Sequence, residues 1–281
     1  MDKPVFYHFD ERLTADTAAD CSLYAIVGTD GFSVLVTDKD GTSLALQSWI
    51  FPNPGRDFKN AASDIRIVFG SEKLFGFSYG KICYAVANAN ATLVPRRLFN
   101  KENLSAYLKL LLQPETYVYS YDALPELDCF LVYAVEAELP DICAAYFPSG
   151  TRTHLAIPLI RATRPVYTGN DYEILVNFRN QQIQMLVYER LNLLFFNTFY
   201  FQTPNDVLYS VLMVYDQFRL NPLEIQLTIS GNLIEDSDIY RLLYRYIRRL
   251  SFVKGPGENQ LPASANILPA HFFFDLFALK S

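Results

Sequence analysis

Two short segments of the chain carry side chains that could bind a phosphate. Thr29, Asp30 and Gly31 combine a hydroxyl, a carboxylate and a glycine at three successive positions, and Ser230 and Gly231 combine a hydroxyl and a glycine much later. Glycine lets backbone N–H groups approach phosphate oxygens, and an aspartate holds Mg²⁺ directly or through water. Tight turns favour the same residue types. The pattern alone therefore leaves both a phosphate site and a simple turn open.

A cluster of basic side chains lies in the segment from Asp238 to Leu250. The cluster consists of Arg241, Arg245, Arg248 and Arg249. The spacing predicts a helix over about 236–250, in which residues three and four apart share a face. The opposite, apolar stripe would consist of Leu242, Leu243, Tyr246, Ile247 and Leu250. Because the guanidinium group binds carboxylates and phosphates well, these arginines are candidates for docking an acidic protein or RNA; a solvated helix face is the alternative.

Other catalytic patterns are absent from the sequence. It has no Gly-x-Ser-x-Gly elbow, no HExxH and no P-loop, and its three histidines are far apart. The cysteines stand singly, without a CxxC spacing, at Cys21, Cys83, Cys129 and Cys143. We therefore expect reduced thiols, no metal site and no catalytic residue.

The composition limits the kinds of partner that the protein can bind. A net charge of −6 argues against non-specific binding to nucleic acid or to an anionic membrane, because both need positive potential, although a local basic patch stays open. The first residues lack the layout of a signal peptide, and the longest apolar stretch is far shorter than a membrane span. We expect a cytoplasmic protein. The 22 Phe and 19 Tyr suit β-rich packing and would also suit self-association.

The chain contains the same order of predicted elements twice. Residues 23–51 predict three short strands, followed by a helix over 58–69, a strand over 82–87 and a helix that Asn100 caps. Residues 171–201 again predict three strands, followed by a helix over 204–218, a strand over 223–233 and the arginine-bearing helix. Such repetition indicates that one βββαβα unit was copied. We predict an α/β fold with mixed sheets in two lobes, residues 1–165 and 166–281.

The region between the two units predicts additional elements. Strands are expected over 117–121, 130–135 and 155–160, with a helix over 139–146. These elements either extend the first lobe or form an inserted subdomain. The apolar tail over 268–279 is expected to dock back on the body.

A tandem βββαβα arrangement looks like the actin-like ATPase architecture, in which two RNase H-like lobes flank a cleft. TLVPRRLF (Thr92 to Phe99), the helix with Tyr107 and Leu108, and the closing PAHFFFDLFAL resemble the DUF3822 family of Bacteroidota proteins over nearly the whole chain. Members of that family look like actin-like folds with no established activity. The resemblance implies a fold and leaves the function open.

The architecture also implies a cofactor, ATP with Mg²⁺, held by an Asp-x-Gly-(Ser/Thr) loop in the first hairpin of each lobe. In the first hairpin, Gly28 stands where the aspartate would be expected, and Asp30 and Gly31 are adjacent. In the second hairpin, Asn177 to Asn180 replace the pattern, and Arg179 stands where close phosphate approach would require glycine. The glycine pair expected on the adenosine side is reduced to one glycine. The candidate nucleotide-binding residues in the cleft are Thr29, Asp30, Gly31, Asn177, Ser230 and Gly231.

Two functional classes remain open. One is a non-catalytic interaction scaffold, a pseudo-ATPase that binds another protein or itself. The other is a divergent nucleotide-binding protein that uses the cleft between the lobes. Intact, paired glycine loops would favour the second class, and their degeneration favours the first.

Overall fold

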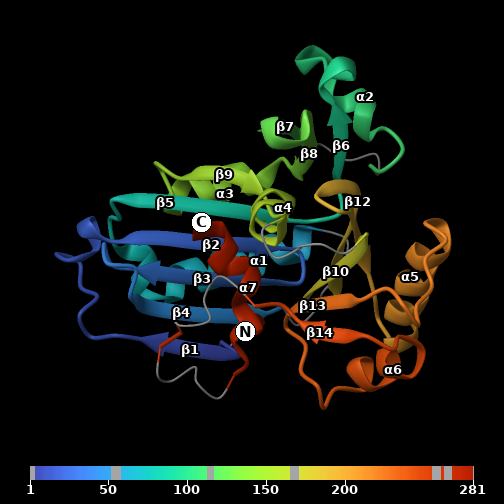
Figure 1. The fold of residues 1–281 in the computed structure, drawn as a ribbon. Helices are drawn as coiled ribbons and strands as arrows, with labels where there is room; N and C mark the ends of the chain where they lie inside the picture. The colour runs from blue at the N-terminus through green and yellow to red at the C-terminus, as the bar shows by residue number, and fades with distance from the viewer. Residues whose placement is uncertain are drawn as a thin grey trace.

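The computed structural model describes residues 4–51, 58–112, 117–164, 171–254, 261–262 and 268–280. These residues form three sheets and the helices that cover them (Figure 1). The expected boundary between the lobes, at residues 165 and 166, lies outside this description. None of the described helices has both the length and the apolarity that crossing a membrane requires.

The first sheet has six strands in the order β1-β4-β3-β2-β5-β9. Its strands are β1 (Phe6–Phe9), β2 (Ser22–Gly28), β3 (Gly31–Thr37), β4 (Ser43–Ile50), β5 (Lys81–Ala87) and β9 (Thr151–His154). The first three strands of the repeat are antiparallel neighbours, whereas β5 and β9 run parallel to β2. Nearly every residue of β2, β3 and β4 is buried, as expected for strands that are covered on both faces.

The second sheet repeats this topology with five strands in the order β12-β11-β10-β13-β14. Its strands are β10 (Tyr172–Arg179), β11 (Gln182–Glu189), β12 (Asn192–Tyr200), β13 (Leu227–Gly231) and β14 (Leu250–Phe252). The meander is antiparallel, and β13 and β14 are parallel to β10. The two sheets therefore share one strand order, and the predicted duplication is confirmed.

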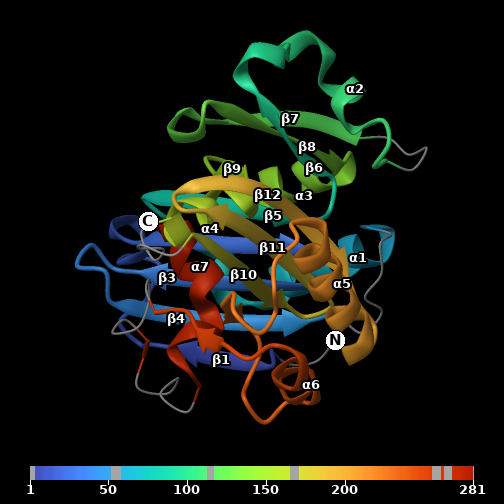
Figure 2. The same ribbon diagram turned by 45° about the vertical axis from the view of Figure 1, so that its right-hand side comes forward.

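Helices cover both faces of each sheet. The helices are α1 (Phe58–Ser71), α3 (Glu138–Tyr146), α4 (Ala156–Thr163), α5 (Pro204–Gln217), α6 (Asp238–Tyr246) and α7 (Phe274–Lys280). In the second lobe α5 and α6 pack together on the outer face of the sheet, over a core that includes Val176, Val211 and Leu243. The apolar tail does dock back: α7 contacts α4 and strands of both sheets, so it lies between the lobes (Figures 1 and 2).

A three-stranded sheet is inserted between β5 and α3 and rises above the rest of the molecule (Figure 2). Its strands are β6 (Ala91–Pro95), β7 (Tyr117–Leu124) and β8 (Cys129–Glu136), and the short helix α2 (Leu104–Leu108) packs against them. The chain enters and leaves through a narrow neck, where the Ala134 N–H donates to the Asn90 carbonyl at 2.9 Å and the Asn88 side chain donates to the Ala134 carbonyl at 2.9 Å. The strands predicted over 117–121 and 130–135 are thus part of this insertion.

Four predicted elements differ from the structure. The strand expected over 155–160 is wrong: these residues begin α4, because a continuous apolar run suits a buried helix as well as a strand. The helix capped by Asn100 is shorter than expected; its first turn is a 3-10 turn, and α2 packs within the inserted sheet. The helix expected over 236–250 ends at Tyr246, because 250–252 pair with β13 as a fifth strand. The strand β13 begins at Leu227, four residues later than predicted.

Candidate functional site

The candidate residues of the first hairpin meet the second hairpin directly. The turn between β2 and β3 holds Thr29 and Asp30, and the turn between β10 and β11 holds Asn180 and Gln181. The Gln181 N–H donates to Asp30 Oδ2 at 3.1 Å, and Asn180 Nδ2 donates to the Asp30 carbonyl at 3.3 Å. Hydrogen bonds between the two lobes therefore close the space that separates the two hairpins.

Gly31 shows how tightly the two turns approach. A Cβ atom at this position would collide with the Asn180 side-chain amide and with the Trp49 carbonyl. The backbone carbonyl cannot move away without shifting β4, so glycine is required here by close approach between the hairpins. A phosphate-binding role would require the same residue for access to a ligand; in this structure the neighbour is protein.

Asp30 is a buried carboxylate with only 1% of its surface exposed. Burial raises its pKa to about 6, although the Arg179 charge and the Gln181 N–H oppose the rise. Its Oδ1 atom has no hydrogen-bond partner among the described residues and turns back towards Gly28. The carboxylate points into the contact between the two hairpins, which we call the interlobe seam. A magnesium ligand would instead have to point into an open cleft.

Arg179, which the sequence places where a phosphate loop needs glycine, is almost wholly buried between the lobes. Its Nη1 donates to Asp275 Oδ2 on α7 at 3.2 Å. Its Nη2 donates to the Ile26 carbonyl at 3.2 Å and to Ser33 Oγ at 3.4 Å, both in the first sheet. One guanidinium therefore connects the second hairpin, the first sheet and α7.

The remaining candidates lie along the face of the second sheet that looks towards the first. Ser230 Oγ donates to Asn177 Oδ1 at 2.9 Å, and Asn177 Nδ2 donates to Gln184 Oε1 at 2.9 Å. Gly231 has φ +80, and a Cβ there would strike the Phe178 carbonyl, which accepts from the Asn232 N–H. The left-handed backbone and the close approach to β10 together require glycine at this position.

The structure thus brings the six candidate nucleotide-binding residues to one interlobe seam. Several buried polar atoms along it lack a partner among the described residues: Asp30 Oδ1, Arg179 Nε, Gln182 Oε1, Gln184 Nε2 and Thr198 Oγ1. Most protein interiors leave few such atoms. The face of the second sheet that lines the seam is therefore polar, whereas its outer face is apolar.

Sequence reasoning missed the residues that complete this seam. These are Gln181, Gln182, Asn232 and Asp275. Asp275 had a signal, because it is the one charged residue within the apolar run HFFFDLFAL, and a carboxylate in such a run needs a buried partner. Gln181 and Gln182 of the second hairpin had no such signal in the sequence, since polar amides are common in turns.

The four candidate arginines do not share one helical face. Arg241 and Arg245 lie on α6, whereas Arg248 and Arg249 lie in the connection to β14. All four are exposed. Arg241 is paired with Asp236 at 3.7 Å and with Asp238 at 3.9 Å. The predicted apolar stripe is partly wrong, because Leu243 and Ile247 are buried but Tyr246 is half exposed.

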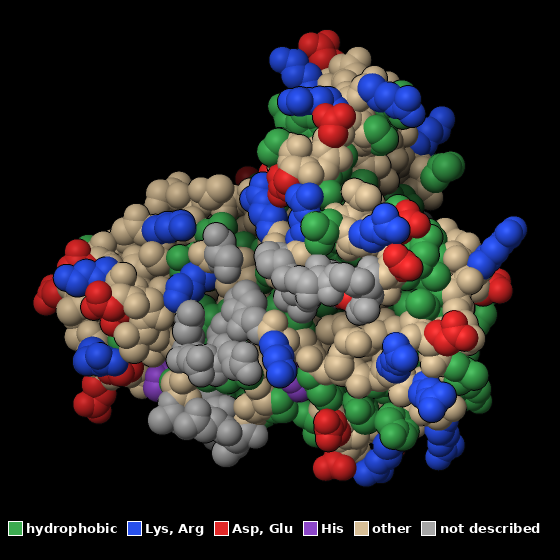
Figure 3. All heavy atoms as spheres, in the orientation of Figure 1, with side chains coloured by type: hydrophobic (Ala, Val, Ile, Leu, Met, Phe, Trp, Pro, Cys, Tyr) green, Lys and Arg blue, Asp and Glu red, His purple; other side chains and the backbone are tan. Residues whose placement is uncertain are grey.

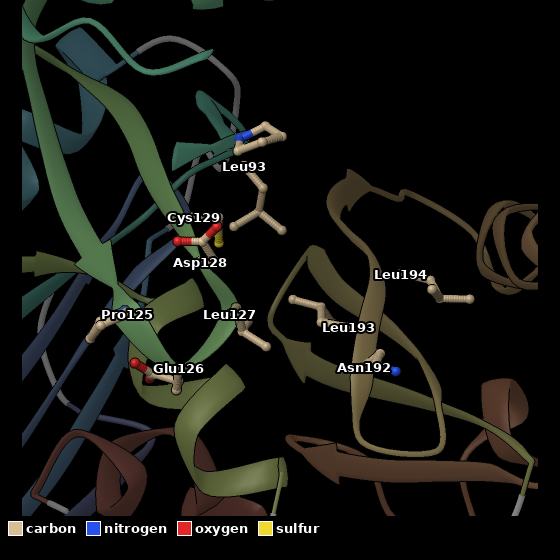
Figure 4. A pocket seen from close by; sticks show the side chains of 10 residues that line it. Leu93, Pro125, Glu126, Leu127, Asp128, Cys129, Asn192, Leu193 and Leu194 are labelled. Carbon is tan, nitrogen blue, oxygen red and sulfur yellow. The ribbon is translucent and has the colours of Figure 1, made fainter. Parts of the chain in front are cut away.

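A separate recess lies between the inserted sheet and the second lobe (Figure 4). The cavity has a volume of about 470 Å³. Its lining consists of Leu93, Pro95, Pro125, Glu126, Leu127, Asp128, Cys129, Asn192, Leu193 and Leu194. Its two carboxylates already face arginines, since Arg161 Nε lies 3.1 Å from Glu126 Oε1 and Arg96 Nη1 lies 3.8 Å from Asp128 Oδ1. The walls are otherwise mostly aliphatic.

The fold defined by the two sheets and their interlobe seam is the actin-like ATPase fold. A Bacteroides thetaiotaomicron protein with an actin-like ATPase fold and unknown function superimposes with a TM-score of 0.75 at 19% identity, covering 86% of this chain and 93% of that one. The PilM-PilN type IV pilus biogenesis complex contains a chain that superimposes with a TM-score of 0.55 at 10% identity, covering 92% of this chain and 96% of that one.

The sequence itself identifies the family. Residues 10–250 match the model of a family described as a protein of unknown function, DUF3822. The chain belongs to this family, as its motifs indicated. A comparison with curated proteins gave no match.

Proposed function

We propose that this chain is a cytoplasmic, non-catalytic interaction scaffold, a pseudo-ATPase that keeps the actin-like fold without its nucleotide chemistry. The observation that carries this proposal is the direct hydrogen bonding between the two hairpins, from Gln181 and Asn180 to Asp30. In a working cleft the backbone donors of these turns would face phosphate oxygens. Here the Gln181 N–H of the second hairpin donates to the Asp30 carboxylate of the first.

The charges along the seam support the same proposal. Arg179 is committed to Asp275 and to two acceptors of the first sheet, so its guanidinium is not turned towards a ligand. Asp30 is buried and accepts from the Gln181 N–H, whereas a carboxylate that binds Mg²⁺ is accessible to the metal. To admit ATP, the lobes would have to separate and leave this buried ion pair exposed or broken. A chain of the PilM-PilN type IV pilus biogenesis complex shares this fold, and it offers a precedent for a scaffold role.

Calorimetric titration with ATP and Mg²⁺ tests this proposal, with ADP and metal-free ATP as parallel titrations. We expect no heat of binding and no rise in the melting temperature. The matched variants are Asp30→Asn in the seam and Asp38→Asn in the next turn of the same meander, where Asp38 accepts from the Asp40 and Thr42 N–H groups. Micromolar binding that Asp30→Asn abolishes and Asp38→Asn preserves would show that the protein is instead a divergent nucleotide-binding protein.

A further inference from the structure

The C-terminal end of α6 presents an unusual group of exposed side chains, which we call the Arg–Tyr surface. It consists of Tyr244, Arg245, Tyr246, Arg248 and Arg249. Tyr244 is 64% exposed and Tyr246 is 50% exposed. Basic side chains gather over α6 at the lower right of the space-filling view (Figure 3). Arginine and tyrosine are among the residue types that are enriched in binding hot spots.

The three arginines of this surface are free to bind a partner. None of Arg245, Arg248 and Arg249 forms an ion pair with a described residue, whereas Arg241, one turn earlier, is held by Asp236 and Asp238. The protein as a whole carries a net charge of −6, so three unpaired cations at one end of a helix are a local exception to its acidic character. Their charge selects an anionic partner.

The Tyr244 ring is supported by a series of rings that reaches the core. The Tyr244 ring stacks on Tyr240, with centroids 6.3 Å apart and ring planes at 19°. Tyr240 stacks in turn on Phe252 at 5.5 Å, and Phe252 stacks on the buried His271 at 3.9 Å. A column of four rings therefore runs from the core to the surface and ends at Tyr244. A ring fixed in this way loses little conformational entropy when a further ring packs against it.

The position of these residues is fixed by the strand that follows. The Arg248 N–H donates to the Pro222 carbonyl at 3.2 Å, and the Arg249 carbonyl accepts from the Leu227 N–H at 2.9 Å. The connection from α6 to β14 is thereby tied to the segment before β13, where Leu223 is 57% exposed. The arginines and tyrosines of the surface thus lie on an ordered connection, and the exposed Leu223 follows the Pro222 that Arg248 contacts.

We propose that the Arg–Tyr surface docks an acidic segment of a partner protein that carries an aromatic residue. The proposal rests on the proposed function, because it names the class of partner that the scaffold would hold. Carboxylates of the segment pair with Arg245, Arg248 and Arg249, and its aromatic ring packs with Tyr244. A long polyanion such as nucleic acid fits less well, because Asp236 and Asp238, which hold Arg241 one turn earlier on α6, would repel its additional phosphates.

The experiment uses synthetic polymers as probes and fluorescence anisotropy as the readout. A random copolymer of glutamate and tyrosine represents the acidic, aromatic segment; polyglutamate supplies charge alone, and oligothymidylate supplies phosphates with bases. We expect the copolymer to bind more tightly than either comparator and to weaken as salt is raised, because ion pairs at an exposed surface are screened.

Two variants and one matched control locate the binding. The triple variant Arg245→Gln, Arg248→Gln, Arg249→Gln should weaken copolymer binding by about tenfold or more, and Tyr244→Ala should weaken it by a smaller factor. The control, Arg96→Gln, Arg97→Gln, Lys101→Gln, removes the same charge from exposed positions in the turns between β6 and α2 and should bind like the wild type. Circular dichroism checks that each variant is folded.

Three results would overturn the proposal: no binding of the copolymer by the wild type, equal loss in the triple variant and the control, or tighter binding of oligothymidylate or polyglutamate than of the copolymer. None of them bears on the nucleotide titration, since α6 covers the outer face of the second sheet and the seam lies on the other. The two proposals therefore fail separately.

Discussion

The two hairpins that face each other across the seam occupy equivalent positions in the two sheets and have opposite chemistry. The first hairpin contains a buried carboxylate, Asp30, and the second contains a buried guanidinium, Arg179. The two groups do not form an ion pair with each other. Arg179 pairs with Asp275 on α7, while Asp30 accepts from the backbone of the second hairpin. Each hairpin also forms hydrogen bonds with the opposite lobe, from Arg179 to the Ile26 carbonyl and from the Gln181 N–H to Asp30. These polar residues therefore hold the two lobes together.

The variant with the largest expected effect removes the cation of the second hairpin. Arg179→Met should lower the free energy of unfolding by about 3–5 kcal/mol, because it leaves Asp275 buried without its partner. Urea denaturation measures the loss. Arg161→Met, which removes an exposed ion pair with Glu126, should cost at most about 1 kcal/mol.

A double replacement sharpens this prediction. Arg179→Met combined with Asp275→Leu should be more stable than Arg179→Met alone, because no buried charge is left unpaired. If the double variant is as unstable as the single one, the hydrogen bonds from Arg179 to the first sheet carry the stability and the ion pair does not.

The carboxylate of the first hairpin makes a pH-dependent contribution. Its pKa of about 6 lies above the ordinary value of 3.8, so the folded protein binds this proton more tightly than the unfolded chain does. The resulting stability is fully present below pH 3.8 and is lost as the pH rises through 6. At about 1.4 kcal/mol per pKa unit, the effect reaches up to about 3 kcal/mol.

Subtraction isolates this effect from the other titrating groups. The unfolding free energy of the wild type minus that of Asp30→Asn should fall between pH 4 and pH 7, when both are measured by urea denaturation in the same buffers. A difference that stays flat would mean that Asp30 is ionised in the folded protein throughout this range, contrary to its burial.

The fit between the two turns gives a smaller effect. Gly31→Ala should destabilise the protein by about 1–3 kcal/mol, because the added methyl group meets the Trp49 carbonyl and the Asn180 amide. Gly76→Ala is the matched control, since nothing lies within 4 Å of its added Cβ. Thermal unfolding of the two variants at the same pH measures the difference. Equal melting temperatures would contradict the close approach of the two turns.

The smallest effect concerns the second lobe away from the seam. Thr203 caps α5 by accepting from the Asp206 N–H, and the Asp206 side chain accepts in return from the Thr203 N–H. Thr203→Ala should cost about 1 kcal/mol, as the loss of an N-cap usually does. A larger loss would indicate that α5 stabilises the seam as well as its own lobe.

The sequence predicted the duplicated meanders, the helix that Thr203 begins and the docking of the apolar tail, because alternation, turns and caps are local signals. It could not predict the fifth strand of the second lobe, because Leu250 to Phe252 is only three residues long and its pairing with β13 is decided by packing. It placed Thr29, Asp30, Asn177 and Ser230 in one region through the expected symmetry of the lobes. It could not predict which acceptor Arg179 would choose, since Asp275 lies 96 residues away in the chain.

The neck of the inserted sheet has a consequence for the order of folding. Because Asn88 and Asn90 are hydrogen-bonded to Ala134, the chain returns to β5 at the point where it left. The pairings of β7 with β8 are close in sequence and can form early. Once β8 has also paired with β6, the intervening residues no longer act as a long flexible loop, and the entropy cost of bringing α3 and β9 to the first sheet falls. We therefore expect early formation of the inserted sheet to increase the rate at which α3 and β9 join the first sheet during folding.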